Sequence, residues 1–514
     1  MHRCLQVPEL VGLVCSHLAI EVLPQLESVR CGARDLAVLA RTSTVFSSHA
    51  LRLVWKSVAL INLLRCLPSD YFRLTTTGAG YMKKYTMEPL RPLRASDWER
   101  VLVYAQHVKH LIADPDFADL SHIFPSVSHR LPKNMLPNLQ GLHWMHLEHD
   151  FQFIDCFLAP QLTTIGIPHT SHAALRLLSN LALRCPQLKV LTLFPRGASD
   201  LRPLTVPAVS QCVRSLHSIE TLIADIVDQP ALEHLSRLSS VRYLRLGEVL
   251  PTLPALPRHA APFPSLQNLY FSSLIESPTW FLEWCNKLPL VKFTAECAAF
   301  STPDEVHRLF SAASAGISHL PLTEFEFSDD YSSFDSSDSA NYLIRPQSLR
   351  SLFCFVNLKS VSVLSAVGID LDDTTVTDMA RSWPHIEHLE LQSYYGNTSP
   401  RATLQCLEAF PKYCPHLTKL CIAFDATVIP TSQANLSLQC LQVLDVEASP
   451  ISTILPVAQV LTRIFPTLRA ILTIRDSFDG DEYWEEEVGP QALQYDRLWQ
   501  DVVSLLSAHE RPER

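Results

Sequence analysis

Histidines spaced three residues apart are the first candidates for chemistry in this sequence. They occur as His143-x-x-His146-x-x-His149, His107-x-x-His110 and His385-x-x-His388. Side chains at positions i and i+3 converge on one metal ion only in a helix. The groups that begin at 143 and 385 overlap predicted strands, so we interpret them as surface histidines with satisfied hydrogen bonds and expect no metal site.

Other motifs that could support catalysis or cofactor binding are incomplete. Gly78-Ala79-Gly80 lacks the third glycine of a dinucleotide-binding loop. Residues 476–482 are acidic but lack the alternating ligands and the final glutamate of a calcium loop, so we interpret them as a solvated turn. No nucleophile elbow, phosphate-binding lysine loop or zinc-protease motif occurs. The sequence therefore predicts no catalytic residue, no metal and no cofactor, and a protein that is not an enzyme.

Cysteine usage and charge exclude further classes. The 514 residues include 14 cysteines without a C-x-x-C pair, a pattern typical of buried thiols in a reducing compartment rather than of a zinc finger. The formal net charge of -10 argues against nucleic-acid binding. The apolar stretch 10–18 is too short for a membrane span and lacks the flanks of a secretory signal. We expect a cytoplasmic or nuclear location, or both, and no membrane partner.

An internal repeat organises the chain. Its pattern is approximately P-x-L-x-x-L-x-L, and the clearest copies span 185–194, 263–272, 383–392 and 414–423. The first apolar positions of the copies are Leu139, Leu162, Leu188, Ile219, Val241, Leu266, Leu290, Leu322, Leu358, Ile386, Leu417, Leu441 and Leu468. These positions extend over 468 − 139 = 329 residues in 12 intervals, so the mean period is about 27 residues, inside the range of ~20–29 for leucine-rich repeats.

Each copy predicts a short strand, and helical stretches lie between the strands. In the copy that begins at Leu188, alternation places Leu191 and Leu193 on one face of the strand. Apolar stripes with helical spacing occur at 173–184, 403–410 and 455–465, each followed by a proline that stops the helix. Strand–helix–strand units of this kind stack through right-handed crossovers into a parallel sheet.

Residues 105–475 resemble a leucine-rich-repeat domain. The resemblance implies an α/β fold, an irregular solenoid with a parallel concave sheet and helices on the convex side. An all-helical solenoid is the alternative, but it does not explain the Leu-x-Leu alternation beside proline.

The first 60 residues predict a small helical module. Helices are expected at 5–18, 34–43 and 49–58, with Pro8 and Glu9 suited to the first turn of the first helix. Such a module could simply cap the repeat array. The segment nevertheless closely resembles an F-box, through Val7-Pro8-Glu9-Leu10, through Leu36, Leu39 and Ala40, and through Leu51-x-Leu53-Val54-Trp55. The stretch 19–33 is longer than in that family.

The resemblance implies a function in protein turnover. In the F-box family the module docks on the Skp adaptor of a Skp–cullin–F-box ubiquitin ligase, and the repeats hold a protein substrate. The matching adaptor-binding residues would be Val7, Pro8, Glu9, Leu10, Leu13, Val14, Leu18, Leu39, Leu51 and Trp55. The arrangement is similar to the F-box/leucine-rich-repeat proteins of mushroom-forming fungi. The alternative is a protein-interaction scaffold whose N-terminal helices only cap the array, with no role in a ubiquitin ligase.

Four segments follow from these patterns. They are a helical module at 1–60, a connecting segment at 61–104, the repeats at 105–475 and an acidic cap or tail at 476–514. An acidic, serine-rich insertion is expected at 328–341, in the longest interval between copies.

Solvent-facing strand positions are the candidate substrate-binding residues. The positions between the core leucines include His143, Thr192, Ile223, Ser362 and Lys419. The middle copies bring together Tyr243, Arg245, Tyr270 and Lys292, an aromatic and cationic combination that is enriched at binding hot spots. Later copies contribute Glu326, Glu390 and Asp445. We expect a protein segment to bind across this change of polarity; ordinary exposed residues are the alternative.

Overall fold

The computed structural model describes residues 7–18, 33–78, 83–195, 201–250, 262–330, 343–394, 399–430, 436–478 and 490–509. Most of the predicted insertion at 328–341, most of the long stretch at 19–33 and the second half of the acidic turn at 476–482 lie outside these residues. The chain forms two compact units, Met1–Ala224 and Asp225–Arg514, and their boundary falls within one strand, β9 (Thr221–Asp228).

The main sheet has 15 strands in the order β1-β4-β6-β7-β8-β9-β10-β11-β12-β13-β14-β15-β16-β17-β18. The strands therefore follow chain order apart from β2, β3 and β5, which form a small separate sheet. Neighbouring strands pair in parallel, as from β4 to β8 and from β10 to β18. The fold is an α/β leucine-rich-repeat architecture, and an all-helical solenoid is excluded.

The first unit begins with three helices. They are α1 (Pro8–Leu18), α2 (Ala33–Thr42) and α3 (Thr44–Val54). Val11 and Cys15 of α1 pack with Leu36 and Ala50 in one small core. The third helix starts earlier than expected, because the side chain of Ser43 accepts a hydrogen bond from the backbone N–H of Val45 and caps it there.

The main sheet starts immediately after these helices, earlier in the chain than the repeat pattern indicates. Strand β1 (Ser57–Ala59) pairs with β4 (His110–Ala113). Between them lie α4 (Leu60–Leu64), α5 (Glu99–Ala105) and the antiparallel pair β2 (Phe72–Thr77) and β3 (Lys84–Pro89), with β5 (Ala118–Asp119) beside β3. The sequence patterns did not predict this small sheet.

The rest of the first unit alternates strands and helices. Its strands are β6 (Gly141–Trp144), β7 (Thr164–Pro168) and β8 (Val190–Phe194), and its helices are α6 (Phe124–Arg130), α7 (Glu148–Phe151), η4 (Gln152–Cys156), α8 (His172–Leu178), α9 (Leu181–Arg184) and α10 (Arg202–Ser215). The helix expected at 173–184 is divided into α8 and α9, because the backbone N–H of Asn180 bonds to Leu177 and closes a tighter turn.

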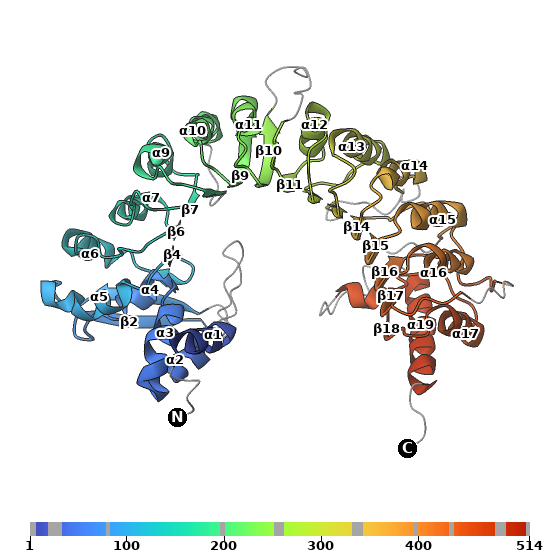
Figure 1. The fold of residues 1–514 in the computed structure, drawn as a ribbon, viewed down its shortest axis with the longest axis horizontal. Helices are drawn as coiled ribbons and strands as arrows, with labels where there is room; N and C mark the ends of the chain where they lie inside the picture. The colour runs from blue at the N-terminus through green and yellow to red at the C-terminus, as the bar shows by residue number, and fades with distance from the viewer. Residues whose placement is uncertain are drawn as a thin grey trace. The chain divides into compact units, whose positions relative to one another are not determined.

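The second unit continues the same alternation. Its strands are β10 (Tyr243–Leu250), β11 (Asn268–Ser273), β12 (Lys292–Cys297), β13 (Glu324–Ser328), β14 (Ser360–Ser365), β15 (His388–Ser393), β16 (Lys419–Ile422), β17 (Val443–Asp445) and β18 (Ala470–Leu472). Its helices include α11 (Gln229–Ser236), α12 (Glu276–Trp284), α13 (Pro303–Gly316), α14 (Pro346–Arg350), α15 (Asp373–Ser382), α16 (Ala409–Tyr413), α17 (Ile454–Ile464) and α19 (Pro490–His509). Within each unit the helices lie along one face of the sheet (Figure 1).

The core lies between that face and the helices. Matching positions of successive strands hold Leu244, Leu269, Phe293, Phe325, Val361, Leu389, Leu420, Leu444 and Ile471, all buried. The first apolar positions of the repeat are also buried, except Leu468, which is half-buried. One strand cannot bury its apolar side alone, so each copy depends on its neighbours.

Candidate functional site

The first candidate surface is the outer face of α1, which consists of Val7 just before the helix and of Leu10, Leu13, Val14 and Leu18. All five side chains are exposed, with Leu10 at 42% and Leu13 at 56% of their possible area. Val11 and Cys15, on the adjoining side of the helix that faces α2 and α3, are fully buried. A small helix therefore presents a continuous apolar strip to solvent, which is typical of interaction sites.

The other residues assigned to adaptor binding lie in different surroundings. Pro8 and Glu9 are exposed in the first turn of α1. Leu39 is half-buried against the small core of the three helices, and Leu51 is also half-buried. The ring of Trp55 stacks on that of Tyr104, with 4.5 Å between ring centroids. The structure thus groups the α1 residues on one exposed surface, whereas Trp55 joins the helices to the repeats.

The second candidate surface is the open face of β10 to β17, the side of the sheet turned away from the helices. Two rows of side chains cross it. One row holds Tyr243, Asn268, Lys292, Glu324, Ser360, His388 and Lys419, and the next holds Arg245, Tyr270, Thr294, Glu326, Ser362, Glu390, Cys421 and Asp445. Arg245, Lys292 and Lys419, all expected at solvent-facing strand positions, lie on this face but not in one row: both lysines precede the row of Arg245 by two residues.

Arg245 and Tyr270 form the aromatic and cationic group that the sequence predicted. The guanidinium carbon of Arg245 lies 4.3 Å from the ring centroid of Tyr270. The Tyr270 hydroxyl donates a hydrogen bond to Glu296, whose pKa is raised mainly by burial. This cation–π contact holds the guanidinium over the ring, so its position is set before any partner arrives.

Lys292 is held by acidic neighbours on the next strand. Its ammonium nitrogen lies 2.6 Å from Glu326 Oε1 and 3.1 Å from Glu324 Oε2. The hydroxyl of Thr294, which the sequence analysis did not single out, donates a second hydrogen bond to Glu326 at 2.9 Å. Further along, Lys419 pairs with Glu390 at 2.6 Å. The open face therefore carries paired charges rather than one extended field.

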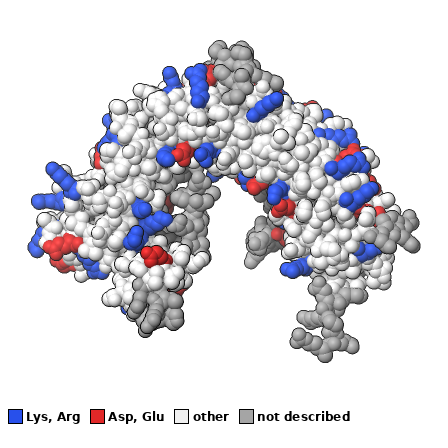
Figure 2. Space-filling view, in the orientation of Figure 1, with Lys and Arg blue, Asp and Glu red and all other residues white. Residues whose placement is uncertain are grey.

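On the side of the molecule that Figure 2 shows, basic and acidic side chains also occur in small mixed groups. Long-range attraction of a strongly charged polymer needs one sign of charge over a wide area. Recognition on this surface would instead rely on local contacts.

Asp445 corrects the predicted exposure at the end of this surface. It is 7% exposed, and burial raises its pKa to about 6. Its Oδ1 accepts the backbone N–H of Glu447, which turns the chain with a φ of 50°. Glu447 is 1% exposed and accepts two hydrogen bonds from Ser393, and burial raises its pKa to about 8. Asp445 is therefore a buried turn residue, not a contact residue.

His143 and Thr192 also differ from the prediction, since both are buried. The ring of His143 lies over Gly166, where a Cβ atom would come within 2.5 Å of its Nδ1. Burial lowers the pKa of His143 to about 4. His146 is buried as well, so these are not surface histidines. Among the described residues, no three His, Cys, Asp or Glu side chains are placed to hold a metal ion.

Most cysteines of the described ranges are buried, as the sequence predicted, but Cys156 is exposed and Cys354 and Cys440 are half-buried. The cysteines in the described ranges are free, and Cys212, Cys285, Cys406 and Cys421 are buried. Burial raises the pKa of Cys212 to about 12, which makes a reactive thiolate unfavourable. No helix within the described ranges has the length and apolar character of a membrane span.

Comparisons with known proteins give structural neighbours only. No family model and no curated protein matches the sequence. An internalin from Listeria monocytogenes is 15% identical, with a TM-score of 0.35 over 72% of this chain and 88% of its own. The yeast Rad7 and Elc1 complex is 16% identical, with a TM-score of 0.33 over 86% and 89%. A leucine-rich-repeat protein of Leptospira interrogans is 14% identical, with a TM-score of 0.31 over 66% and 74%. With TM-scores this low, these likenesses do not bear on function.

Proposed function

We propose that this chain is the substrate-recognition adaptor of a Skp–cullin–F-box ubiquitin ligase. The outer face of α1 docks on the Skp adaptor, and the open face of β10 to β17 binds a protein substrate. The chain contributes proximity and orientation, while the catalytic groups belong to the ligase. The cytoplasm and the nucleus are where such a complex would act.

The exposed apolar strip on α1 is the observation that carries this proposal. Leu10, Leu13, Val14 and Leu18 are among the residues that resemble an F-box, and all four are exposed. Keeping large apolar side chains in water is unfavourable, and burying them against a partner recovers about 25 cal/mol for each Å² of apolar area. An amphipathic helix that lays its apolar side into a groove is a recurrent mode of protein recognition.

The scaffold function remains the second candidate, and a specific contact favours it. Trp55 at the end of α3 stacks on Tyr104, and β1 follows at once and joins the main sheet. These contacts anchor the helical module on the first repeats, as a cap would require. A cap alone, however, gives no reason for the apolar strip on the far side of α1.

Co-purification with the Skp adaptor tests the proposal. The full chain should retain the adaptor, and Leu10→Asp or Leu13→Asp should remove it because a carboxylate would be buried in the interface. Pro8→Gly should weaken binding by loosening the first turn. Leu204→Asp on α10 is the matched control, since Leu204 is also an exposed leucine of the first unit. If the intact chain retains no adaptor, or if Leu13→Asp retains it fully, the scaffold function replaces the proposal.

A further inference from the structure

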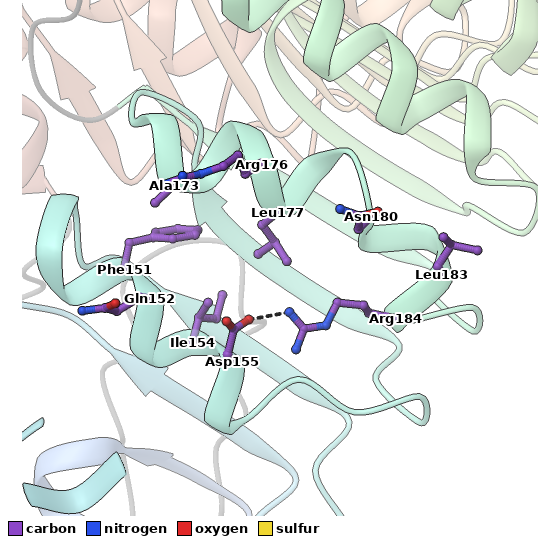
Figure 3. A pocket seen from close by; sticks show the side chains of 10 residues that line it. All are labelled: Phe151, Gln152, Ile154, Asp155, Ala173, Arg176, Leu177, Asn180, Leu183 and Arg184. Carbon is purple, nitrogen blue, oxygen red and sulfur yellow. Dashed lines mark hydrogen bonds and ion pairs between the residues drawn. The ribbon is translucent and has the colours of Figure 1, made fainter. Parts of the chain in front are cut away.

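The first unit contains a groove on its helical side, and none of its lining residues belongs to either surface described above. It lies between α7 and η4 on one side and α8 and α9 on the other, and its volume is about 560 Å³ (Figure 3). Phe151, Ile154 and Leu177 form a buried apolar floor. The Asp155–Arg184 ion pair joins the two sides.

Leu183 extends the apolar lining to the outside of the molecule. It is 83% exposed, although it belongs to the short helix α9 and lines the groove. A leucine in this position adds apolar surface beyond the cavity itself. An occupant that covered only the cavity would leave it in water, so the surface fits an elongated ligand better than a compact one.

The polar lining has an uncompensated positive charge. Arg184 is neutralised by Asp155, whereas Arg176 is exposed and has no hydrogen bond or ion pair within the described part of the chain. The amides of Gln152 and Asn180 lie at the same groove and can donate to or accept from a peptide backbone. The described lining residues therefore offer an apolar surface, two amide groups that can form hydrogen bonds, and the unpaired guanidinium of Arg176.

We propose that this groove binds a linear peptide segment of a partner protein, with an apolar anchor side chain next to a carboxylate that pairs with Arg176. Peptide anchors of this kind gain affinity from the buried apolar side chain and specificity from the charge. A nucleic acid would need many cations, and among the described residues that line the groove only Arg176 has no ion-pair partner. The inference is independent of the function proposed above, because no residue of α1 or of the open face takes part.

Selection from a library of short random peptides displayed on phage, with the full chain as target, tests the inference. The enriched peptides should share a Leu, Ile or Phe close to an Asp or Glu. Binding of one such synthetic peptide, measured by fluorescence polarisation, should weaken about tenfold or more with Arg176→Glu, because an attractive contact becomes repulsive. Changing the acidic residue of that peptide to lysine should restore binding to this variant.

Arg214→Glu supplies the matched control. Arg214 is an exposed arginine on α10 that does not line the groove, so this variant should bind the peptide as the unaltered chain does. Leu183→Asp should also weaken binding. Either of two results would overturn the inference: selection that enriches no acidic peptide, or an acidic peptide whose binding Arg176→Glu and Leu183→Asp leave unchanged. Adaptor co-purification should be the same in all of these variants, so failure here leaves the adaptor proposal standing.

Discussion

Leu10 and Val11 are neighbours in α1 and point about 100° apart around the helix axis, one outside the small core of the three helices and one into it. Leu10 is 42% exposed, whereas Val11 is fully buried with Cys15, Leu36 and Ala50. The helix therefore uses one side to hold the three-helix module together and leaves the other side available. The two sides should respond differently to truncation.

Val11→Ala should open the module, and Leu13→Ala should not. Removing buried methyl groups leaves a cavity, and we expect a loss of about 1–2 kcal/mol. Leu13 is exposed, so its truncation should stay within about 0.5 kcal/mol. Alanine has the higher helix propensity in both cases, so propensity cannot explain a loss at Val11. Hydrogen exchange of the α3 amides measures the difference. An equal loss of protection in the two variants would show that the outer face of α1 is also structural.

Glu447 should make the second unit less stable as the pH rises. Burial raises its pKa from 4.5 to about 8, so between these values the folded chain keeps a proton that the unfolded chain has released. The folded state then binds more protons, and the free energy of unfolding falls with increasing pH across that window. Asp445, with its pKa raised to about 6, acts in the same direction. Urea denaturation between pH 5 and pH 8 should show the decline.

Glu447→Gln should flatten this decline, because glutamine stays neutral and can still accept from Ser393. The variant should gain stability relative to the unaltered chain near pH 8 and differ little near pH 5. Glu387→Gln is the control, since Glu387 is paired with Lys359 at the surface and its pKa is lowered by that partner. Asp445 should still contribute to the decline below about pH 6, so an undiminished decline between pH 6 and pH 8 in Glu447→Gln would contradict the assignment.

The repeat could be predicted because the spacing of its apolar residues indicates which side of each strand is buried. Leu191 and Leu193 lie two residues apart on one face, with Val190 and Thr192 on the other, and this alternation is fixed by strand geometry alone. The small sheet of β2, β3 and β5 could not be predicted in this way, because its strands lack the leucine pattern. Nor could β1, which is only three residues long.

Exposure on the open face was harder to predict, because it depends on the neighbouring strand. Alternation correctly places His143 on the open face. The neighbouring residue on β7 is Gly166, however, and because it has no side chain the His143 ring lies over it and is buried. Asp445 was assigned to solvent by the same alternation, but the turn at Glu447 encloses it. For α1 the apolar residues were identified, but only the packing of Val11 and Cys15 shows that the strip faces outward.

Gly166→Ala should destabilise the first unit because the added methyl group collides with the His143 ring. Removing that ring should relieve the collision. The added Cβ would meet His143 Nδ1 at 2.5 Å, and overpacking of this kind costs about 1–3 kcal/mol. In a His143→Ala background the same substitution should cost much less. Thermal unfolding of the two single variants and the double variant measures this coupling, and additive losses would contradict it.

Gly247→Ala is the contrasting case in the second unit. Its Cβ would lie 2.1 Å from the backbone oxygen of Asp225, so shortening a side chain cannot relieve the collision. We expect a larger loss than at Gly166 and no rescue by Asp225→Ala. If Asp225→Ala did rescue it, the collision would involve the carboxylate rather than the backbone.

Arg245 and Tyr270 should be energetically coupled in the folded chain. A double-mutant cycle with Arg245→Met and Tyr270→Leu keeps much of the apolar volume of both side chains and removes the stacking of the cation on the ring. We expect a coupling of about 0.5–1 kcal/mol, measured by urea denaturation. Added salt should reduce the coupling of the exposed Lys359–Glu387 pair more strongly, since that pair depends on opposite charges in water. A coupling of zero for Arg245 and Tyr270 would mean that the ring does not fix the guanidinium, and Arg245 would then not be pre-positioned for a partner on the open face.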